Sequence, residues 1–424
     1  MDELRILHAA DLHIDSPMHG LVAYEGAPTD AVRNATRTAL RSLVSKAIEK
    51  RVQLVLIAGD LYDGEWKDYN TGLFVANQFD QLNEAGIPVV VIHGNHDAAS
   101  RVARNLRYPP NTRVLSSGHP DTLTFPDLGV AVHGQSYPTR AVLEDLSLGY
   151  PQAIAGLLNI GMLHTCLEGS SDHDPYAPCK LDELRSKRYD YWALGHVHNR
   201  RVVSEDPPIV FPGNLQGRHI RETGPKGATL VTFTNGEPQL EELVVDAVRW
   251  ELCQVDVSRA QTFDECLDLC QARILEISEG GADSYAIRVE LRGSTAASGQ
   301  LRSGFERLVN EIRAIGLSAR QAEIQIEKVK LSTSASRERL DVETSALGAE
   351  IAAVLSELRA SVSQISDSDD QILAPLRALR LAFRDAGMPP EDDPTTEVAL
   401  LEALDDAAGL LIDRLETKGA YRAN

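Results

Sequence analysis

The sequence has few cysteines and no hydrophobic run long enough to span a membrane. Its five cysteines among 424 residues are an odd number without a paired framework. This usage excludes a disulfide-stapled secreted domain and fits a reducing cytosol. The start, Met1-Asp2-Glu3, is acidic and does not follow the pattern of a signal peptide. We therefore expect a cytoplasmic protein that does not associate with a membrane.

The chain also lacks positive charge, with a formal net charge of −20. Nucleic-acid binders usually carry a basic footprint, so this balance stands against a DNA-binding role. However, residues 337–424 contain 18 acidic and 9 basic residues, a net of −9, so nearly half of the excess lies in this segment. The basic residues that could contact a phosphate backbone, or could simply be solubilising, are Arg101, Arg104, Arg107, Arg200, Arg201, Arg218, Arg221 and Lys226.

Five apolar stretches each run directly into polar residues that can bind metal. A buried strand needs such an apolar run, and in open α/β sheets ligands bind beyond the carboxyl ends of the strands. The repetition therefore predicts a single pocket. The polar groups that follow the five stretches are Asp11-Leu12-His13, Gly59-Asp60-Leu61-Tyr62-Asp63, Gly94-Asn95-His96-Asp97, His164, and Gly195-His196-Val197-His198.

The ligand types in this pocket indicate which ions it would bind. They are four carboxylates, one amide and five imidazoles, without cysteine. Such a set suits hard or borderline divalent ions, so Mn²⁺, Fe²⁺ and Zn²⁺ are all admissible. Asp11 and His13 are two residues apart, as are His196 and His198, and an extended chain points such pairs to one side. Each pair can thus bind metal from one strand end.

Several of these residues also have ordinary structural interpretations. A lone histidine beside an apolar strand is more often a core residue than a ligand, as we expect for His8, His93 and His133. Gly94 is compatible with a plain turn, and Asp97 with a helix cap. Five motifs in the expected strand contexts nevertheless favour the functional interpretation.

The motif series resembles that of the calcineurin-like metallophosphoesterase superfamily. Asp-x-His, Gly-Asp-x-x-Asp, Gly-Asn-His-Asp, a lone His and Gly-His-x-His occur in that order across about half of the chain. The resemblance implies an α/β fold, a metallophosphoesterase β-sandwich flanked by helices, with two divalent metal ions, and we expect Mn²⁺. It implies a first metal bound by Asp11, His13, Asp60 and His198, and a second bound by Asn95, His164 and His196, with Asp60 bridging both.

Two cations roughly 3.5–4 Å apart can stabilise the attacking and leaving oxygens of an in-line displacement at a phosphate ester. In the family, the histidine at the position of His96 contacts the scissile phosphate or protonates the leaving alkoxide. Asp97 is expected to orient this imidazole and raise its pKa. Asp63 stands where some repair-nuclease branches carry a histidine that helps to turn the phosphate.

The chain is predicted to contain three parts: a nuclease core over residues 1–246, a small α/β capping domain over 247–332 and a helical C-terminal region over 333–424. In the core we expect helices over residues 30–51 and 71–84. In the capping domain, the sequence predicts strands over 250–257, 285–291 and 322–328, and helices over 263–279 and 299–315. In the tail, helical spacing relates Leu347, Ile351, Val354, Leu355 and Leu358, then Val398, Leu400, Leu401, Leu404, Leu410 and Leu411 beyond Asp392-Asp393-Pro394.

Three further segments narrow the resemblance to the YhaO group of exonuclease proteins of the SbcD type. They are residues 174–179, 189–198 and 211–222. On the pocket rim, Asp63, Asn214, Arg218 and His219 are expected to bind substrate, although Gly213 beside them could serve only a turn.

The resulting hypothesis is a two-metal phosphodiesterase that hydrolyses DNA, as an exonuclease or endonuclease in DNA repair. The resemblance implies an ATPase partner of the structural-maintenance class that binds the C-terminal helices, although such helices more commonly fold back on their own protein. A homodimer through the stripe of residues 32–48 or 74–82 is an alternative to core packing of that stripe. Two other functions stay open: a small-molecule or cyclic-nucleotide phosphoesterase, and a weakly active regulatory subunit of an ATPase.

Overall fold

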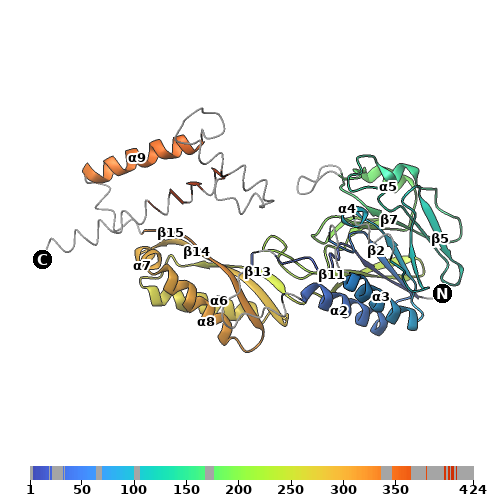
Figure 1. Cartoon of the computed structure of the whole chain (residues 1–424), viewed down its shortest axis with the longest axis horizontal. Helices are drawn as coiled ribbons and strands as arrows, with labels where there is room; N and C mark the ends of the chain where they lie inside the picture. Colours follow the sequence, from blue (N-terminus) through green and yellow to red (C-terminus); the bar gives the residue numbers. More distant parts are fainter. Residues whose placement is uncertain are drawn as a thin grey trace. The chain divides into compact units, whose positions relative to one another are not determined.

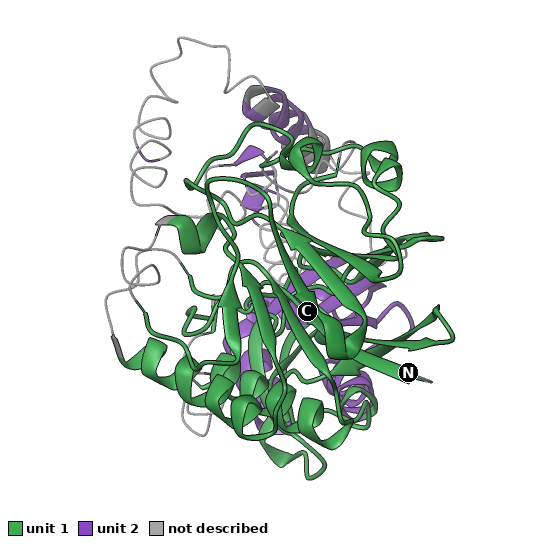
Figure 2. Cartoon of the chain, turned by 90° about the vertical axis from the view of Figure 1, so that its right-hand side faces the viewer, with its two compact units in different colours: residues 1–252, 276–288, 316–328 green, residues 253–275, 289–315, 329–424 purple. Residues whose placement is uncertain are grey.

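The computed structural model describes residues 3–18, 20–21, 32, 34–63, 69–99, 106–167, 176–335 and 346–363, with isolated residues between 379 and 407. The chain divides into two compact units (Figures 1 and 2). Unit 1 comprises residues 1–252, 276–288 and 316–328, and unit 2 comprises residues 253–275, 289–315 and 329–424.

Unit 1 is built on two six-stranded sheets. The first has the order β12 (Glu237–Val244), β11 (Gly227–Thr234), β1 (Glu3–Ala9), β2 (Leu54–Ala58), β3 (Val89–Ile92) and β4 (Thr112–Val114). The second has the order β5 (Asp121–Phe125), β6 (Val130–Gly134), β7 (Leu158–His164), β8 (Tyr191–Gly195), β10 (Pro208–Phe211) and β9 (Arg201–Glu205).

Apolar side chains of both sheets pack together into one buried cluster. Ile6, Leu56 and Val90 of the first sheet share this cluster with Ile160 and Ala193 of the second. Strands β1 to β4 are mutually parallel, as are β6, β7, β8 and β10. The predicted β-sandwich is confirmed, and parallel pairing places the carboxyl ends of these strands along one edge of each sheet.

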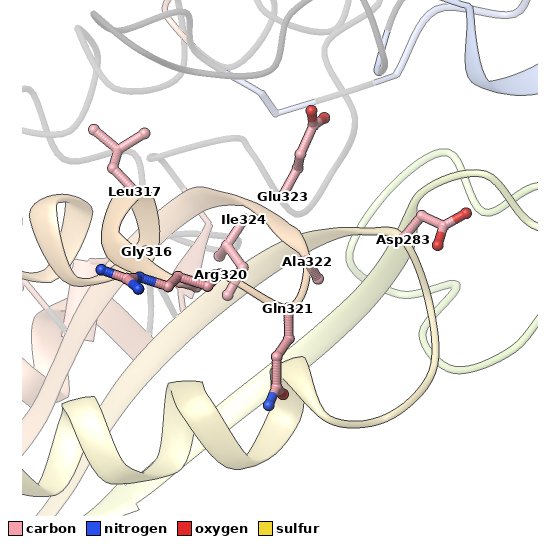
Figure 3. A pocket seen from close by; sticks show the side chains of 9 residues that line it. Asp283, Gly316, Leu317, Arg320, Gln321, Ala322, Glu323 and Ile324 are labelled. Atoms are coloured by element: carbon pink, nitrogen blue, oxygen red, sulfur yellow. The ribbon is translucent and has the colours of Figure 1, made fainter.

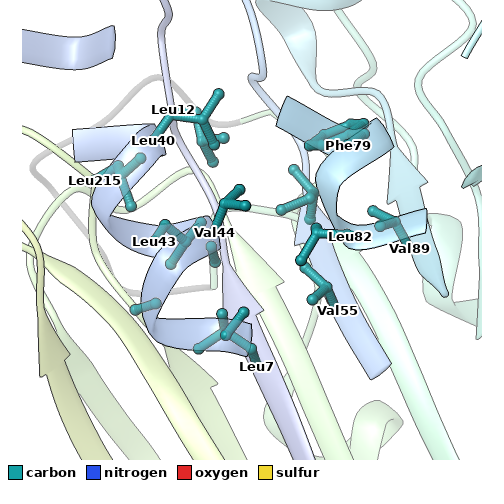
Figure 4. Close-up of a cluster of buried hydrophobic side chains, with 14 of the residues drawn as sticks. Leu7, Leu12, Leu40, Leu43, Val44, Val55, Phe79, Leu82, Val89 and Leu215 are labelled. Carbon is teal, nitrogen blue, oxygen red and sulfur yellow. The ribbon is translucent and has the colours of Figure 1, made fainter. Parts of the chain in front are cut away.

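Helices α2 (Ala35–Glu49) and α3 (Tyr69–Glu84) cover the outer face of the first sheet. Leu40, Leu43 and Val44 of α2 are buried in a cluster with Phe79 and Leu82 of α3 and with strand side chains (Figure 4). Both predicted helices are present, although Asp30, where the first was expected to begin, lies outside the described residues. The apolar stripes cover the sheet, so core packing accounts for them. The homodimer stays a prediction.

Short elements complete unit 1. They are α4 (Asn95–Ala99), α5 (Leu181–Ser186) and the 3-10 helices η2 (Pro126–Leu128) and η3 (Leu146–Gly149). A shallow cavity of about 430 Å³ lies between Asp283 and residues 316–324 (Figure 3), and none of the predicted site residues lines it.

The predicted capping elements form a sheet with the order β13 (Arg249–Asp256), β14 (Ser284–Thr295) and β15 (Glu323–Ala335), together with α6 (Phe263–Ser278), α7 (Ser298–Ser303) and α8 (Phe305–Ser318). The expected single helix over 299–315 is two helices that meet at Gly304, which ends α7. A glycine favours such an interruption because it costs a helix about 1 kcal/mol. The domain boundaries at 246 and 332 stay predictions.

The described part of the C-terminal tail contains α9 (Ala346–Ser363). Val354 and Leu358 of its predicted stripe are 55% and 45% exposed. Asp392-Asp393-Pro394 and the later leucine pair Leu410-Leu411 lie outside the described residues. Among the helices of the described chain, none combines the length and the hydropathy that a membrane crossing requires.

His8 is a buried core residue that connects the two sheets, as expected from the sequence. Its Nε2 lies 3.1 Å from the carbonyl oxygen of Leu194, and its Nδ1 lies 2.9 Å from the hydroxyl of Tyr191. A carbonyl can only accept, so Nε2 carries the proton and Nδ1 accepts from Tyr191. His133 is likewise satisfied, by Thr122 and Asn159. Burial lowers the pKa of His8 to about 3.

We predict that His8 makes the fold less stable as pH falls. Below pH 6.5 the unfolded state binds a proton that the folded state refuses, so stability is lost as the pH falls from 6.5 toward 3. Between pH 7.5 and 5.5 this contribution is about 1.4 kcal/mol. Urea unfolding without metal should show a smaller pH dependence for His8→Gln than for the wild type and for the exposed control His119→Gln. Equal slopes for all three proteins would contradict the assignment.

Candidate metal centre

Every predicted metal ligand lies at the carboxyl end of a parallel strand or just beyond it. Asp11 and His13 follow β1, Asp60 follows β2, Asn95 begins α4 after β3, His164 ends β7, and His196 and His198 follow β8. The polar residues at the carboxyl ends of the two sheets therefore lie close together. Figure 1 shows β2 of the first sheet and β7 of the second in the same part of unit 1.

Three overlapping groups of side chains could each hold an ion, with ligand atoms within 4.8 Å of one another. They are Asp11 with His13 and His198, Asp11 with Asp60 and His164, and His13 with Asp60 and His96. Because Asp11, His13 and Asp60 each belong to two groups, the groups form one continuous cluster. The structure thus brings together residues that lie up to about 190 positions apart in the sequence.

In the first part of the cluster, two imidazole nitrogens face each other. Nε2 of His13 and Nε2 of His198 are 3.3 Å apart. The same nitrogens lie 3.9 Å from Asp60 Oδ2 and from Asp11 Oδ1, respectively. Nitrogen lone pairs and carboxylate oxygens converging in this way form a donor set that suits a divalent cation.

In the second part, His164 is oriented by the backbone. Its Nδ1 donates to the carbonyl oxygen of Ala58 at 3.0 Å, so Nε2 is the nitrogen left to bind a ligand. That Nε2 lies 3.0 Å from Asn95 Oδ1 and 3.4 Å from Asp60 Oδ2. His196 stacks edge-on against His164 with ring centroids 5.2 Å apart. Asp60 therefore borders both parts of the cluster.

Backbone strain is concentrated among the same residues. Asp11, His13, Asp60 and His196 have φ values of 52°, 42°, 51° and 98°. Residues other than glycine rarely adopt this left-handed region, and strain of this kind clusters at functional sites.

Two glycines allow the strand ends to approach the ligands. A Cβ at Gly94 would lie 2.3 Å from Asp60 Oδ1 and 2.8 Å from His164 Nε2. A Cβ at Gly195 would lie 1.9 Å from the carbonyl oxygen of Ala58. Gly94 is therefore more than a turn residue, because any side chain at this position would displace a candidate ligand.

The electrostatics of the cluster favour positive charge. Burial raises the pKa of Asp60, but the neighbouring His164, His13 and His96 outweigh it and hold this pKa well below its usual range. Burial raises the pKa of Asp11 to about 6. Burial lowers the pKa of His164, yet the carboxylates of Asp60 and Asp11 together raise it to about 9. A pocket that draws a proton onto a fully buried imidazole is suited to a cation.

The prediction that Asp97 orients His96 is corrected by the structure. Nδ1 of His96 lies 2.9 Å from Asp63 Oδ1, whereas the Asp97 carboxylate accepts from the backbone N–H groups of Leu61, Tyr62 and Gly94. Asp97 is buried and anchors the loops that follow β2 and β3. Burial lowers the pKa of His96, but the hydrogen bond to Asp63 and the charges of Asp60 and Asp63 together outweigh it, so the pKa is raised.

The rim residues differ in what they can contact. Asn214 is fully buried, and its Nδ2 donates to Gln216 O and Glu222 Oε2, which corrects its expected place on the rim. Arg218 lies beside the cluster, with one terminal nitrogen 3.3 Å from Ser16 Oγ and 3.9 Å from Asp63 Oδ2. His219 is half-buried, 3.5 Å from Glu222. Of the basic residues proposed from sequence, Arg101 and Arg104 lie outside the described residues.

Glu222 is a site residue that the sequence did not reveal. Its Oε1 lies 2.6 Å from Nδ1 of His198. Burial raises the pKa of Glu222, but the hydrogen bond with His198 and the charge of Arg218 outweigh it and hold the pKa well below its usual range. The single sequence holds no spacing signal for this pair, because 24 positions and a β-hairpin separate the two residues.

We predict that Gly94→Ala weakens metal binding. The added methyl group must displace Asp60 or His164, because the three contacts it would make are all shorter than 3.0 Å. Mn²⁺ affinity, measured by isothermal titration calorimetry, should fall at least about tenfold. Gly118→Ala is the matched control, since its Cβ would meet nothing closer than 3.9 Å. Unchanged affinity in Gly94→Ala would contradict the close approach seen at this position.

Comparison with known proteins agrees with this geometry. The family model of the calcineurin-like phosphoesterases matches residues 4–200, and that of the middle domain of metallophosphoesterase YhaO matches residues 250–334. A dimetal phosphatase from Danio rerio has a TM-score of 0.35 and 12% identity, covering 57% of this chain and 98% of its own, which is too weak a likeness to support an assignment.

Two curated relatives extend the match. The metallophosphoesterase YhaO of Bacillus subtilis is 36% identical over 298 residues, which cover 69% of this chain and 73% of the relative. The DNA double-strand break repair protein Mre11 of Sulfurisphaera tokodaii is 27% identical over 268 residues, which cover 58% of this chain and 64% of that protein. With the family motifs gathered into one cluster, this chain belongs to the calcineurin-like metallophosphoesterases, close to YhaO.

Proposed function

We propose that this metallophosphoesterase hydrolyses phosphodiester bonds in DNA, as an exonuclease or endonuclease that uses two Mn²⁺ ions. The observation that carries the proposal is the overlapping ligand cluster, in which Asp60 takes part in two groups. The similarity to a protein named for double-strand break repair supports DNA as the substrate. A role in DNA repair follows as part of the same proposal.

The proposed ligands divide as the sequence suggested. Asp11, His13, Asp60 and His198 would hold the first ion, and Asn95, His164 and His196 would hold the second with Asp60. Two bound divalent ions would neutralise the phosphate and make water a nucleophile at neutral pH. The carboxylate of Asp60 suits a shared position because it offers two oxygens, and Nε2 of His164 and of His13 lie within 3.9 Å of one of them.

His96 would supply the proton chemistry. Its raised pKa favours the protonated ring, whose free nitrogen can donate to a phosphate oxygen or to the leaving alkoxide. Asp63 holds the other nitrogen at 2.9 Å and is itself held by Ser16 at 2.8 Å. This orientation by a carboxylate is the support that a general acid requires.

Arg218 would contribute to substrate binding at the edge of the cluster. Its guanidinium lies beside Asp63 and Glu222, and its Nε has no hydrogen-bond partner within the described chain. An arginine is well suited to a phosphate oxygen because its donors form a planar fork. A local cation of this kind reconciles a net charge of −20 with an anionic substrate.

The C-terminal helices are the proposed binding site of an ATPase of the structural-maintenance class. The exposed Val354 and Leu358 on α9 support this proposal because they are apolar and uncovered. A cytoplasmic location is proposed with it, since such a partner would act on chromosomal DNA.

We predict that substitutions of the metal ligands and of His96 impair DNA cleavage in different ways. Asp60→Asn and His196→Ala should abolish Mn²⁺-dependent cleavage of labelled single- or double-stranded DNA and weaken Mn²⁺ binding. His96→Ala should bind Mn²⁺ normally but cleave about 10²- to 10⁴-fold more slowly, the usual contribution of a positioned acid. The exposed His119→Ala is the control and should cleave at the wild-type rate.

The substrate is tested in the same experiment by including cyclic nucleotides and small phosphomonoesters. Hydrolysis of a small ester with no cleavage of either form of DNA would overturn the DNA proposal and favour a small-molecule phosphoesterase. Mn²⁺ binding without hydrolysis of any substrate would favour a regulatory subunit.

A second prediction distinguishes the roles of Asp63 and Asp97, the two aspartates near His96. Asp63→Asn removes the carboxylate that orients the ring, so the cleavage rate should fall about 10²-fold while Mn²⁺ binding is kept. Asp97→Asn disrupts the acceptor of three backbone N–H groups, so it should lower the free energy of unfolding by about 1–3 kcal/mol. Urea unfolding and single-turnover cleavage measure the two effects. A larger loss of turnover in Asp97→Asn than in Asp63→Asn would reverse the roles.

A further inference from the structure

The two ring nitrogens of His198 face different surroundings. Nε2 lies 3.3 Å from Nε2 of His13 and 3.9 Å from Asp11 Oδ1, on the side of the ligand cluster. Nδ1 lies 2.6 Å from Glu222 Oε1, on the opposite side of the ring. Since a carboxylate can only accept, the contact requires a proton on Nδ1. His198 can then present a bare Nε2 lone pair to a metal.

The carboxylate of Glu222 is itself held in place. Its Oε2 accepts from Nδ2 of Asn214 at 2.9 Å and from the backbone N–H of Arg218 at 2.7 Å. Glu222 is 3% exposed. One oxygen is thus fixed by the surrounding loop, which leaves the other aimed at His198.

The guanidinium of Arg218 competes with Glu222 for Nδ1 of His198. A terminal nitrogen of its guanidinium lies 3.4 Å from Nδ1 of His198. Arginine can only donate, so without Glu222 this group would favour a bare Nδ1, and in the neutral ring the proton would move to Nε2. A proton on Nε2 blocks the nitrogen that faces Asp11 and His13. Glu222 therefore decides between two tautomers that have opposite consequences for metal binding.

We infer that Glu222 is a positioning residue for metal binding, which holds His198 in the tautomer whose Nε2 is unprotonated and faces Asp11 and His13. The inference rests on the proposed metal site but not on DNA as its substrate. Carboxylates placed behind ligating histidines typically contribute 10- to 100-fold in metal affinity. Glu222 cannot itself join the cluster through this contact, because it touches the ring on the far side from Nε2.

The first test measures Mn²⁺ affinity and stoichiometry by calorimetry on the full chain, without substrate. Glu222→Ala should lose about 10- to 100-fold in the affinity of at least one ion. Glu222→Gln should also lose affinity, because its amide oxygen is needed to accept from Asn214 Nδ2 and the backbone N–H of Arg218, which turns the NH₂ group toward Nδ1. Glu241→Gln is the matched control, since this exposed carboxylate pairs only with Lys50 at 3.0 Å among the described residues and should leave Mn²⁺ binding unchanged. Wild-type affinity and stoichiometry in Glu222→Ala would overturn the inference.

The second test reads the tautomer directly, which a purely structural role of Glu222 would not change. Long-range ¹H–¹⁵N spectra of the metal-free protein, with His198 assigned through His198→Asn, should show the proton on Nδ1 in the wild type. Glu222→Ala should shift the proton toward Nε2, and Glu222→Gln supplies this measurement if the alanine variant does not fold. A proton on Nε2 in the wild type contradicts the inference. Because neither test uses DNA, a failure to cleave DNA leaves this inference standing, and the reverse also holds.

Discussion

The close approach of the two sheets at their carboxyl ends is the constraint on which the metal centre depends. Gly195, at the end of β8, lies so near the carbonyl oxygen of Ala58 at the end of β2 that a Cβ there would come within 1.9 Å. The same carbonyl accepts from Nδ1 of His164 at 3.0 Å. The carbonyl group of Ala58 thus lies where the two sheets approach most closely at this point, and it also orients the candidate ligand His164. Apolar side chains of the strands pack the two sheets together. Glycine at position 195 permits the close approach because it has no Cβ.

A common arrangement recurs behind three imidazoles of the cluster. His164 is held by a backbone carbonyl, His96 by Asp63 and His198 by Glu222. In each pair an acceptor occupies Nδ1 and leaves the other nitrogen for a metal or a phosphate. Such support fixes ring orientation and tautomer and raises the basicity of the ligand. The chemistry of the site therefore depends on groups that bind neither ion nor substrate.

The cluster is also costly to build, which indicates that a bound ion belongs to its native state. Asp11 and Asp60 are buried carboxylates a few ångströms apart, and four candidate ligands adopt left-handed backbone angles. Buried like charges and strained backbone each destabilise a fold unless something offsets them. A divalent cation would offset the charge repulsion directly. The carboxylates of the cluster are thus candidate metal ligands, whereas the acidic residues of the C-terminal tail are not.

The sequence by itself determined the β-sandwich, its main helices and the set of candidate ligands. Apolar strands followed by short polar motifs are local features, and local features survive in a single sequence. The sequence alone is therefore enough to select residues such as Asp60 and His164 as candidate ligands. Their assignment to a first or second ion stays a prediction.

Only the tertiary structure decided which groups support these ligands. The sequence favoured Asp97 as the partner of His96 because the two are neighbours, yet adjacent residues on a short helix point in different directions. Asp63 meets His96 instead, Asn214 is buried beneath the rim, and Glu222 reaches His198 across a β-hairpin. These contacts join segments that are distant in the chain. Their partners follow from how the strands pair and the loops pack, and no spacing rule within one sequence encodes that information.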